Sequence, residues 1–125
     1  MTEATAPSAA VAEPDALDLE TMRESARRLL GDDAELPTTE ELETLTLLLR
    51  GHMMLLIPAV EDATRGLSED SIPRACALAC VGEARMRLGL EPGQTLPAGI
   101  AHAQRLSRSV NALCDHVVNL DGPHQ

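Results

Sequence analysis

The longest regular stretch of the chain is residues 38–65, TTEELETLTLLLRGHMMLLIPAVEDATR, and its spacing predicts a single helix over residues 39–65. Thr38 and Glu41 form a capping box, in which each side chain accepts from a backbone amide of the other. Pro58 removes one backbone hydrogen bond, so we expect a kink there. Apolar residues recur at spacings of three and four, as in a helix that packs in a core. That series is Leu42, Leu45, Leu49, His52, Leu56, Ala59 and Ala63.

Three more helices follow from the same kind of spacing, and clusters of Gly, Pro and acidic residues separate them. No stretch alternates apolar and polar residues for long, so no strand is expected. Seven-residue repeats in several helices favour shallow crossings. The sequence therefore predicts an all-α fold, a four-helix bundle. Its helices are expected at residues 17–30, 39–65, 72–89 and 98–120.

The helix at residues 72–89 carries small and apolar residues on two sides. A helix that is apolar on two sides is covered on two sides, so we expect this one to be the central helix. One side is Ile72, Ala75, Ala79, Gly82 and Met86, and the other is Ala77, Val81, Ala84 and Leu88.

The composition excludes several classes of partner. The chain has no Phe, Tyr or Trp, so it lacks the aromatic side chains that hold bases, sugars or methylated cations. Its formal net charge is −10, and 12 of its 20 acidic residues lie in residues 1–43. Nucleic acids and anionic membranes bind clustered basic side chains, and the ten Arg residues do not cluster. We therefore expect neither nucleic acid nor membrane as a partner.

The two ends of the chain are expected to lie outside a helical domain at residues 17–120. Residues 1–16 hold no large apolar side chain beyond Met1 and Val11, which predicts a disordered acidic tail, and residues 121–125 are expected to form a short C-terminal tail. The chain shows neither the basic start and apolar run of a signal peptide nor the roughly 20 apolar residues that span a bilayer. An odd count of three Cys indicates reduced thiols. The predicted location is the cytoplasm.

Three apolar residues of the helix at residues 39–65 lie on the side away from its core series. They are Leu47, Met54 and Ile57. Apolar residues that share an exposed stripe are typical of a contact surface. We therefore predict that this stripe forms a homodimer or binds a protein partner.

His52 stands where the spacing requires an apolar residue. A histidine there must find hydrogen-bond partners for its ring nitrogens or lose their hydration. One interpretation is a metal ligand or a proton-responsive switch. The other, which we favour, is a core histidine bonded to a carbonyl, a carboxylate or a water, with a pKa that burial lowers.

One narrow strip of the helix at residues 72–89 carries two thiols, an acid and a base. The strip consists of Cys76, Cys80, Glu83 and Arg87. Thiols four residues apart on a helix can bind one metal ion, and residues of other helices would then complete the site. Those candidates are His52, His102 and Cys114. Because CxxC and HExxH motifs are missing, we favour two buried, unreactive thiols beside an ion pair, and we predict no metal or other cofactor.

The sequence assigns no catalytic residue. Cys114 and His116 are two positions apart on a helix and so point about 200° apart, which does not suit a thiol and its base. The favoured function is a helical protein-interaction or regulatory module that self-associates and has no catalytic activity. One alternative is a small-ligand binder or sensor, and the other is a metal- or thiol-dependent enzyme. The pocket of the ligand binder would lie near His52, Cys76, Cys80 and Glu83.

Three segments together resemble a known family. They are Arg50-Gly51-His52 with Leu56-Ile57-Pro58, residues 76–85 (CALACVGEAR) and residues 111–116 (NALCDH). Over residues 17–120 the chain is similar to a family of small uncharacterised proteins from streptomycetes, known as a domain of unknown function. The resemblance implies an actinobacterial source, which the Arg-only basic composition also suggests. It implies no activity and carries no catalytic role to any residue.

Overall fold

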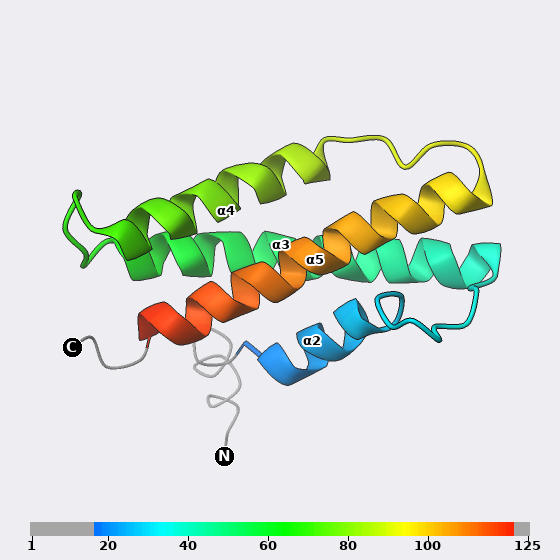
Figure 1. Cartoon of the computed structure of the whole chain (residues 1–125), viewed down its shortest axis with the longest axis horizontal. Helices are drawn as coiled ribbons and strands as arrows, with labels where there is room; N and C mark the ends of the chain where they lie inside the picture. Colours follow the sequence, from blue (N-terminus) through cyan, green and yellow to red (C-terminus); the bar gives the residue numbers. More distant parts are fainter. Residues whose placement is uncertain (1–16, 122–125) are drawn as a thin grey trace, which may run out of the picture.

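The computed structural model describes residues 17–121, and these residues form four α-helices and no strand (Figure 1). The predicted all-α four-helix fold is confirmed. The first helix is shorter than predicted, because residues 28–30 form a turn instead. The two predicted tails lie outside the described residues, apart from Asp121. The helices are α2 (Leu19–Arg27), α3 (Thr39–Thr64), α4 (Ile72–Leu88) and α5 (Leu96–Asp121).

Side-chain caps set where the helices begin. The Thr38 hydroxyl accepts a hydrogen bond from the amide of Glu41 at 3.0 Å, which starts α3 where the sequence predicts. The other half of the predicted capping box is not formed, because the Glu41 carboxylate pairs with Arg28 at 3.0 Å instead. Ser71 caps α4 in the same way. α5 begins two residues earlier than predicted, because Thr95 caps it and Pro97 lies in its first turn. A proline is tolerated there, since amides of the first turn have no partner within the helix.

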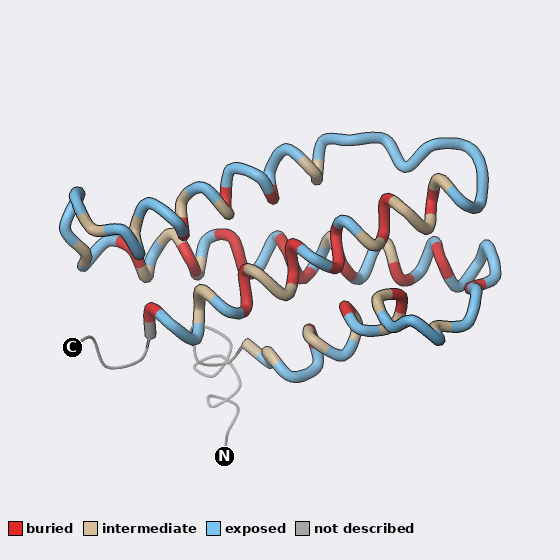
Figure 2. The backbone as a smooth tube through the Cα atoms, in the orientation of Figure 1, coloured by how far each residue is buried: buried red, intermediate tan, exposed pale blue. Residues whose placement is uncertain are grey.

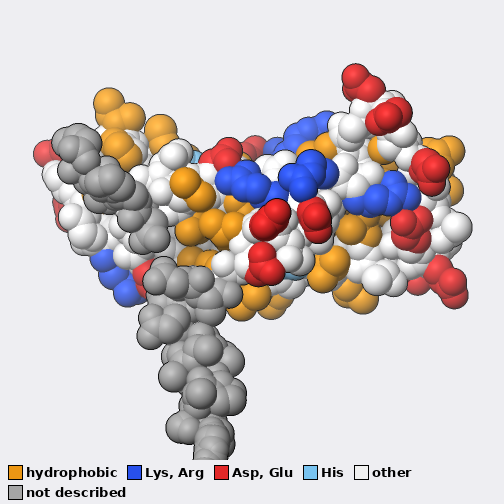
Figure 3. Space-filling model, turned by 90° about the horizontal axis from the view of Figure 1, so that it is seen from below, with side chains coloured by type: hydrophobic (Ala, Val, Ile, Leu, Met, Phe, Trp, Pro, Cys, Tyr) orange, Lys and Arg blue, Asp and Glu red, His pale blue; other side chains and the backbone are white. Residues whose placement is uncertain are grey.

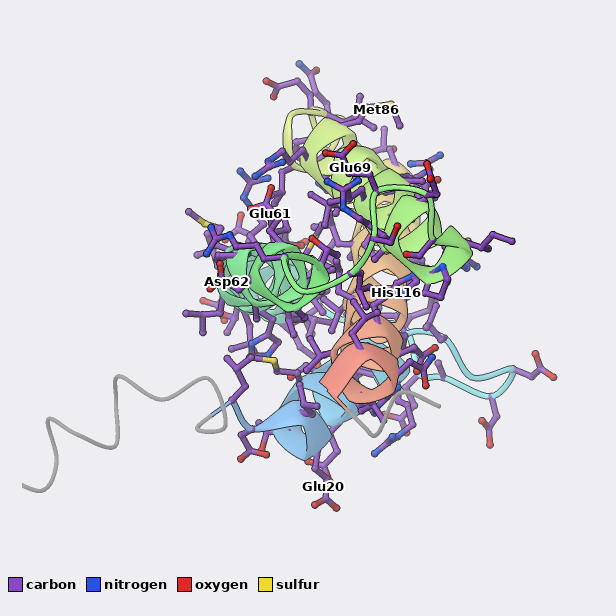
Figure 4. All side chains as sticks on the ribbon, turned by 90° about the vertical axis from the view of Figure 1, so that its left-hand side faces the viewer. Glu20, Glu61, Asp62, Glu69, Met86 and His116 are labelled. Atoms are coloured by element: carbon purple, nitrogen blue, oxygen red, sulfur yellow. The ribbon has the colours of Figure 1, made fainter. Side chains whose placement is uncertain are left out.

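The helices run alternately up and down, and α3 and α5 lie side by side at the centre. Figures 1 and 4 show α4 on one side of this pair and α2 on the other. Most fully buried large side chains therefore come from α3 and α5, and Figure 2 shows the buried positions concentrated along these two helices. The largest of them are Leu49, Met53, Leu56, Leu106 and Leu113.

The prediction that the helix at residues 72–89 is central is wrong. α4 buries Ala77, Val81 and Ala84 and exposes its other predicted side, including Ile72 and Met86. Figure 4 shows Met86 pointing away from the bundle. Small residues such as Ala and Gly occur both where helices pack closely and on surfaces that face solvent. Their presence on one side of a helix therefore does not show that this side is buried.

The helices differ in length, and this difference shapes one end of the bundle. α3 and α5 have 26 residues each and α4 has 17. At 1.5 Å per residue, α4 is about 13 Å shorter than its two neighbours. Residues 89–95 span the remaining distance as a loop above α3 and α5 (Figure 1). A part of the α3–α5 pair is thus covered by loop rather than by helix.

α3 is long and apolar enough to cross a membrane by length and composition, which the sequence prediction had not expected. Its most apolar window of 18 residues is 39% buried inside the bundle. A core helix of a soluble bundle passes the same test, because packing also requires apolar residues. The part of α3 that packing does not explain is its outer face.

Candidate functional site

The side of α3 that faces away from the other helices is apolar along its whole middle section. We call it the α3 outer face; it consists of Thr44, Leu47, Leu48, Gly51, Met54, Leu55 and Pro58. All of these residues are exposed, Leu47 at 70% and Met54 at 65%. The only charged residue between Glu43 and Glu61 is Arg50, which turns toward α4 and donates to the Leu88 carbonyl at 2.9 Å. A contiguous apolar surface of this kind is typical of an interaction site.

One residue of the predicted contact stripe was wrongly assigned. Ile57 is only 5% exposed and belongs to the core. The heptad series predicted a narrow buried stripe, whereas α3 contacts α2, α4 and α5 and so buries a wider arc. Sequence reasoning also missed Leu48 and Leu55, which are exposed beside Leu47 and Met54.

The α2 side of the bundle has a different character. Figure 3 shows acidic and basic side chains intermixed there, with hydrophobic side chains at the surface both between them and along the edges. Arg23 pairs with Asp115 of α5 at 2.8 Å, and Arg28 pairs with Glu41 of α3 at 3.0 Å. These pairs attach α2 and the turn that follows it to both central helices.

His52 is a buried residue on the α2 side of α3. Its Nε2 lies 3.3 Å from the Ser25 hydroxyl of α2. Burial lowers the pKa of His52, as the core interpretation predicts. A neutral imidazole with a hydroxyl partner has its polar group satisfied, so this histidine is explained by packing.

The predicted strip on α4 holds an ion pair. Arg87 donates to Glu83 at 3.0 Å and also to the Ser109 hydroxyl of α5 at 3.0 Å. The strip therefore fastens α4 to α5. It does not meet His52, because His52 contacts α2 on the opposite side of the α3–α5 pair. The predicted pocket that combined His52 with Cys76, Cys80 and Glu83 is not formed by these contacts.

The three cysteines are free thiols with different surroundings. Cys76 is exposed, so the expectation that it is buried is wrong; Cys80 is partly buried and Cys114 is buried. Burial raises the pKa of the Cys80 thiol, and Glu83 raises it further. Burial also raises the pKa of Cys114. Raised pKa values keep both groups in the thiol form, which is a poor nucleophile and a poor metal ligand. Among residues 17–121, no three His, Cys, Asp or Glu side chains are placed to hold a metal ion.

A groove of about 720 Å³ lies where α4 ends short of its neighbours. Its walls come from the first turns of α3 and α5, the end of α4 and the loop at residues 89–95. Gly99 lets the two central helices approach at its floor, since a Cβ there would lie 2.9 Å from Leu42 Cδ2. Gly93 turns the loop with a positive φ of 86°, which favours glycine.

The groove contains one of the predicted site residues, His102, together with Arg50. His102 is 2% exposed, and its Nε2 has no hydrogen-bond partner in the part of the chain that the structure describes. Burial lowers the pKa of His102, Arg50 and Arg105 lower it further, and Glu91 opposes them. His102 was predicted only as a partner for the cysteines of α4. Arg50 was missed, although it is the single charge within the apolar run of α3 and could have been singled out for that reason.

This combination of four helices, an exposed apolar helix face and a groove beside it defines a small all-α bundle protein. Residues 20–122 match the family of unknown function DUF6415, and the chain belongs to that family. The resemblance to an uncharacterised family is thereby confirmed. No curated protein and no solved structure matches the chain.

Proposed function

We propose that this protein is a helical interaction module, without catalytic activity, that self-associates through the α3 outer face. The observation that carries the proposal is the exposure of four large apolar side chains on one uncharged face. They are Leu47, Leu48, Met54 and Leu55. Exposed apolar groups lose contact with water when two copies meet, and burial contributes roughly 25 cal/mol per Å² of apolar surface. A single apolar side chain on a surface needs no explanation, but four on one face do.

Gly51 lies in the middle of the α3 outer face and supports a close contact there. A Cβ at Gly51 would meet no other atom of the described residues within 4 Å, so nothing in that part of the chain requires glycine. Glycine inside a helix is nevertheless unfavourable by roughly 0.8–1.0 kcal/mol relative to Ala. A second helix that packs against the backbone at Gly51 would explain the residue, because small residues let helices approach closely.

The pattern of the face favours a second copy of the chain as the occupant. Positions equally far from Gly51 match in character, with Leu47 opposite Leu55 and Leu48 opposite Met54. Two antiparallel α3 helices that cross at Gly51 would bring these pairs together about a two-fold axis. Such an arrangement is isologous, and closed two-fold dimers are the commonest oligomers. A different protein partner would not require this symmetry.

Two charge substitutions, one on the α3 outer face and one elsewhere, test the proposal when their effects on self-association are compared. Met54→Glu places a carboxylate in the apolar face, while Met86→Glu places one on an exposed position of α4. We expect Met54→Glu to weaken self-association and Met86→Glu to leave it unchanged, with equal helicity by circular dichroism. Light scattering at micromolar concentration gives the molar mass of each. Equal effects of the two variants would contradict the proposal.

The other functions have different support. Small-ligand binding is favoured by the groove and is developed below. A metal- or thiol-dependent enzyme has no comparable support, because the described residues hold no ligand set and the pKa values of Cys80 and Cys114 are raised. The cytoplasm as location and the lack of nucleic-acid or membrane partners stay predictions, as does the actinobacterial source.

A further inference from the structure

We propose that the groove between α3, α5 and the loop at residues 89–95 binds a small amphipathic carboxylate, such as a medium-chain fatty acid. The carboxylate would lie at Arg50 and His102, and the hydrocarbon body would lie against the leucines of the walls. Of the residues in the α3 outer face, this site includes only Leu47, and either proposal stands without the other.

His102 lines the groove and supplies the first reason, a polar atom that is buried without a partner and that a ligand reaches only when the ring turns toward the groove. Its Nε2 is buried and has no partner among residues 17–121. Leaving a buried polar group unpaired destabilises a fold, so native proteins pair nearly all of them. Since its pKa is lowered, the imidazole is neutral near pH 7 and carries one N–H. A carboxylate oxygen can accept from that N–H.

Arg50 supplies the second reason, a positive charge beside His102. The Arg50 Nη1 donates to the Leu88 carbonyl at 2.9 Å, and this bond fixes the side chain across the groove. A guanidinium has five N–H donors, so this bond leaves others for a ligand. Arg50 is partly buried, whereas Glu43 and Glu91 of the lining are exposed to water, which weakens their repulsion of a carboxylate without removing it. Arg–carboxylate pairs are among the strongest polar contacts in proteins.

The apolar walls supply the third reason, a place for a hydrocarbon body. The walls include Leu42, Leu47, Leu88, Leu90 and Leu96. A volume of about 720 Å³ lies within the usual size of small-molecule sites. A ligand that was charged throughout would leave these leucines unmatched, and a pure hydrocarbon would leave Arg50 and His102 unmatched. A carboxylate with an aliphatic chain matches both parts.

Isothermal titration with three probes of equal chain length tests the ligand class. Octanoate, octan-1-ol and octylamine differ only in the head group. We expect saturable binding of octanoate with one molecule per chain, binding of octan-1-ol weaker by about tenfold, and no binding of octylamine, because the charged contact contributes the difference. Equal affinity for all three would overturn the carboxylate assignment. No saturable binding of octanoate would overturn the site.

Variants locate the binding. Arg50→Gln and His102→Leu should each weaken octanoate binding by about tenfold or more. The control is Arg23→Gln, which removes a partly buried Arg on the α2 side and should leave binding unchanged. Without ligand, His102→Leu should raise the melting temperature, since it removes the unpaired nitrogen. If Arg50→Gln binds octanoate as tightly as the wild-type protein, the proposal is wrong, whatever happens to His102→Leu.

Octanoate binding is also measured with Met54→Glu, because Leu47 borders both the groove and the α3 outer face. If a monomeric Met54→Glu variant binds octanoate, the groove binds its ligand without self-association. Loss of octanoate binding in this variant would contradict a site formed within one chain.

Discussion

Substitution of Gly51 by Ala separates the stability of α3 from self-association. An added Cβ meets no atom within 4 Å, so the folded chain accepts it without strain. Ala is favoured over Gly inside a helix by about 0.8–1.0 kcal/mol. For a domain of this size, a gain of about 1 kcal/mol raises the melting temperature by roughly 4–8 °C. In the monomeric state the substitution is therefore expected to stabilise the protein.

The same methyl group should weaken the proposed dimer, because that dimer places the two Gly51 residues at its two-fold axis. Overpacking a close contact costs about 1–3 kcal/mol, and about 1.4 kcal/mol changes an association constant tenfold. Roughly tenfold weaker association is thus the central expectation. Gly82→Ala is the matched control, since Gly82 is an exposed helix-interior glycine on α4 with equally open space around it.

Thermal melts at low concentration measure the gain in both variants, and sedimentation measures the dissociation constant. Low concentration matters because the melting temperature of a dimer depends on concentration. If Gly51→Ala and Gly82→Ala both raise the melting temperature and both leave association unchanged, the contact at Gly51 does not exist. If Gly51→Ala lowers the stability of the monomer, then the added Cβ does meet other atoms, and the inference that the folded chain accepts it without strain is wrong.

Three further predictions concern the core and the thiols. The pKa of His52 is lowered on folding, so the unfolded chain binds an extra proton below about pH 6.5 and stability falls as the pH drops through that range. His52→Leu should therefore raise the melting temperature more at pH 5.5 than at pH 8; an equal rise at both would count against a neutral core histidine. Without denaturant, a thiol reagent should label Cys76 quickly and Cys114 slowly, and fast labelling of Cys114 would contradict its burial. Gly99→Ala should change the free energy of unfolding by less than about 1 kcal/mol in a denaturant titration, because its Cβ would lie 2.9 Å from Leu42 Cδ2, the end of a flexible side chain that can shift, and Ala is favoured over Gly in a helix; a loss of about 3 kcal/mol would show that Leu42 cannot shift.

The positions of the helices could be predicted from the sequence because periodic apolar spacing and cap residues act locally. Thr38 and Ser71 are examples, since each bonds an amide three residues later. The central position of α3 and α5 could not be predicted in the same way. α4 has small residues on two sides, and only contacts with distant parts of the chain decide which side is buried. Ile57 was misplaced for a related reason, since the number of neighbours of α3 sets the width of its buried arc.

The groove was not predicted, although the sequence held a signal for it. The predicted helix at residues 72–89 was shorter than those at 39–65 and 98–120, and a shorter helix cannot cover its neighbours along their full length. What the sequence could not give is the unpaired Nε2 of His102, because a missing hydrogen bond depends on every side chain around it. Spacing within α4 suggested cysteine partners for His102, whereas the fold places it beside Arg50 of α3.

Sedimentation equilibrium of the wild-type protein tests self-association most directly. The chain has a mass of 13.3 kDa, and the measurement extends from low to high micromolar concentration. We expect the average mass to rise with concentration to twice that value and to go no further, since a two-fold interface closes on itself. Met54→Glu should stay near the mass of one chain over the same range. A wild-type mass of 13.3 kDa at every concentration would contradict the account, and so would a mass that keeps rising beyond the dimer.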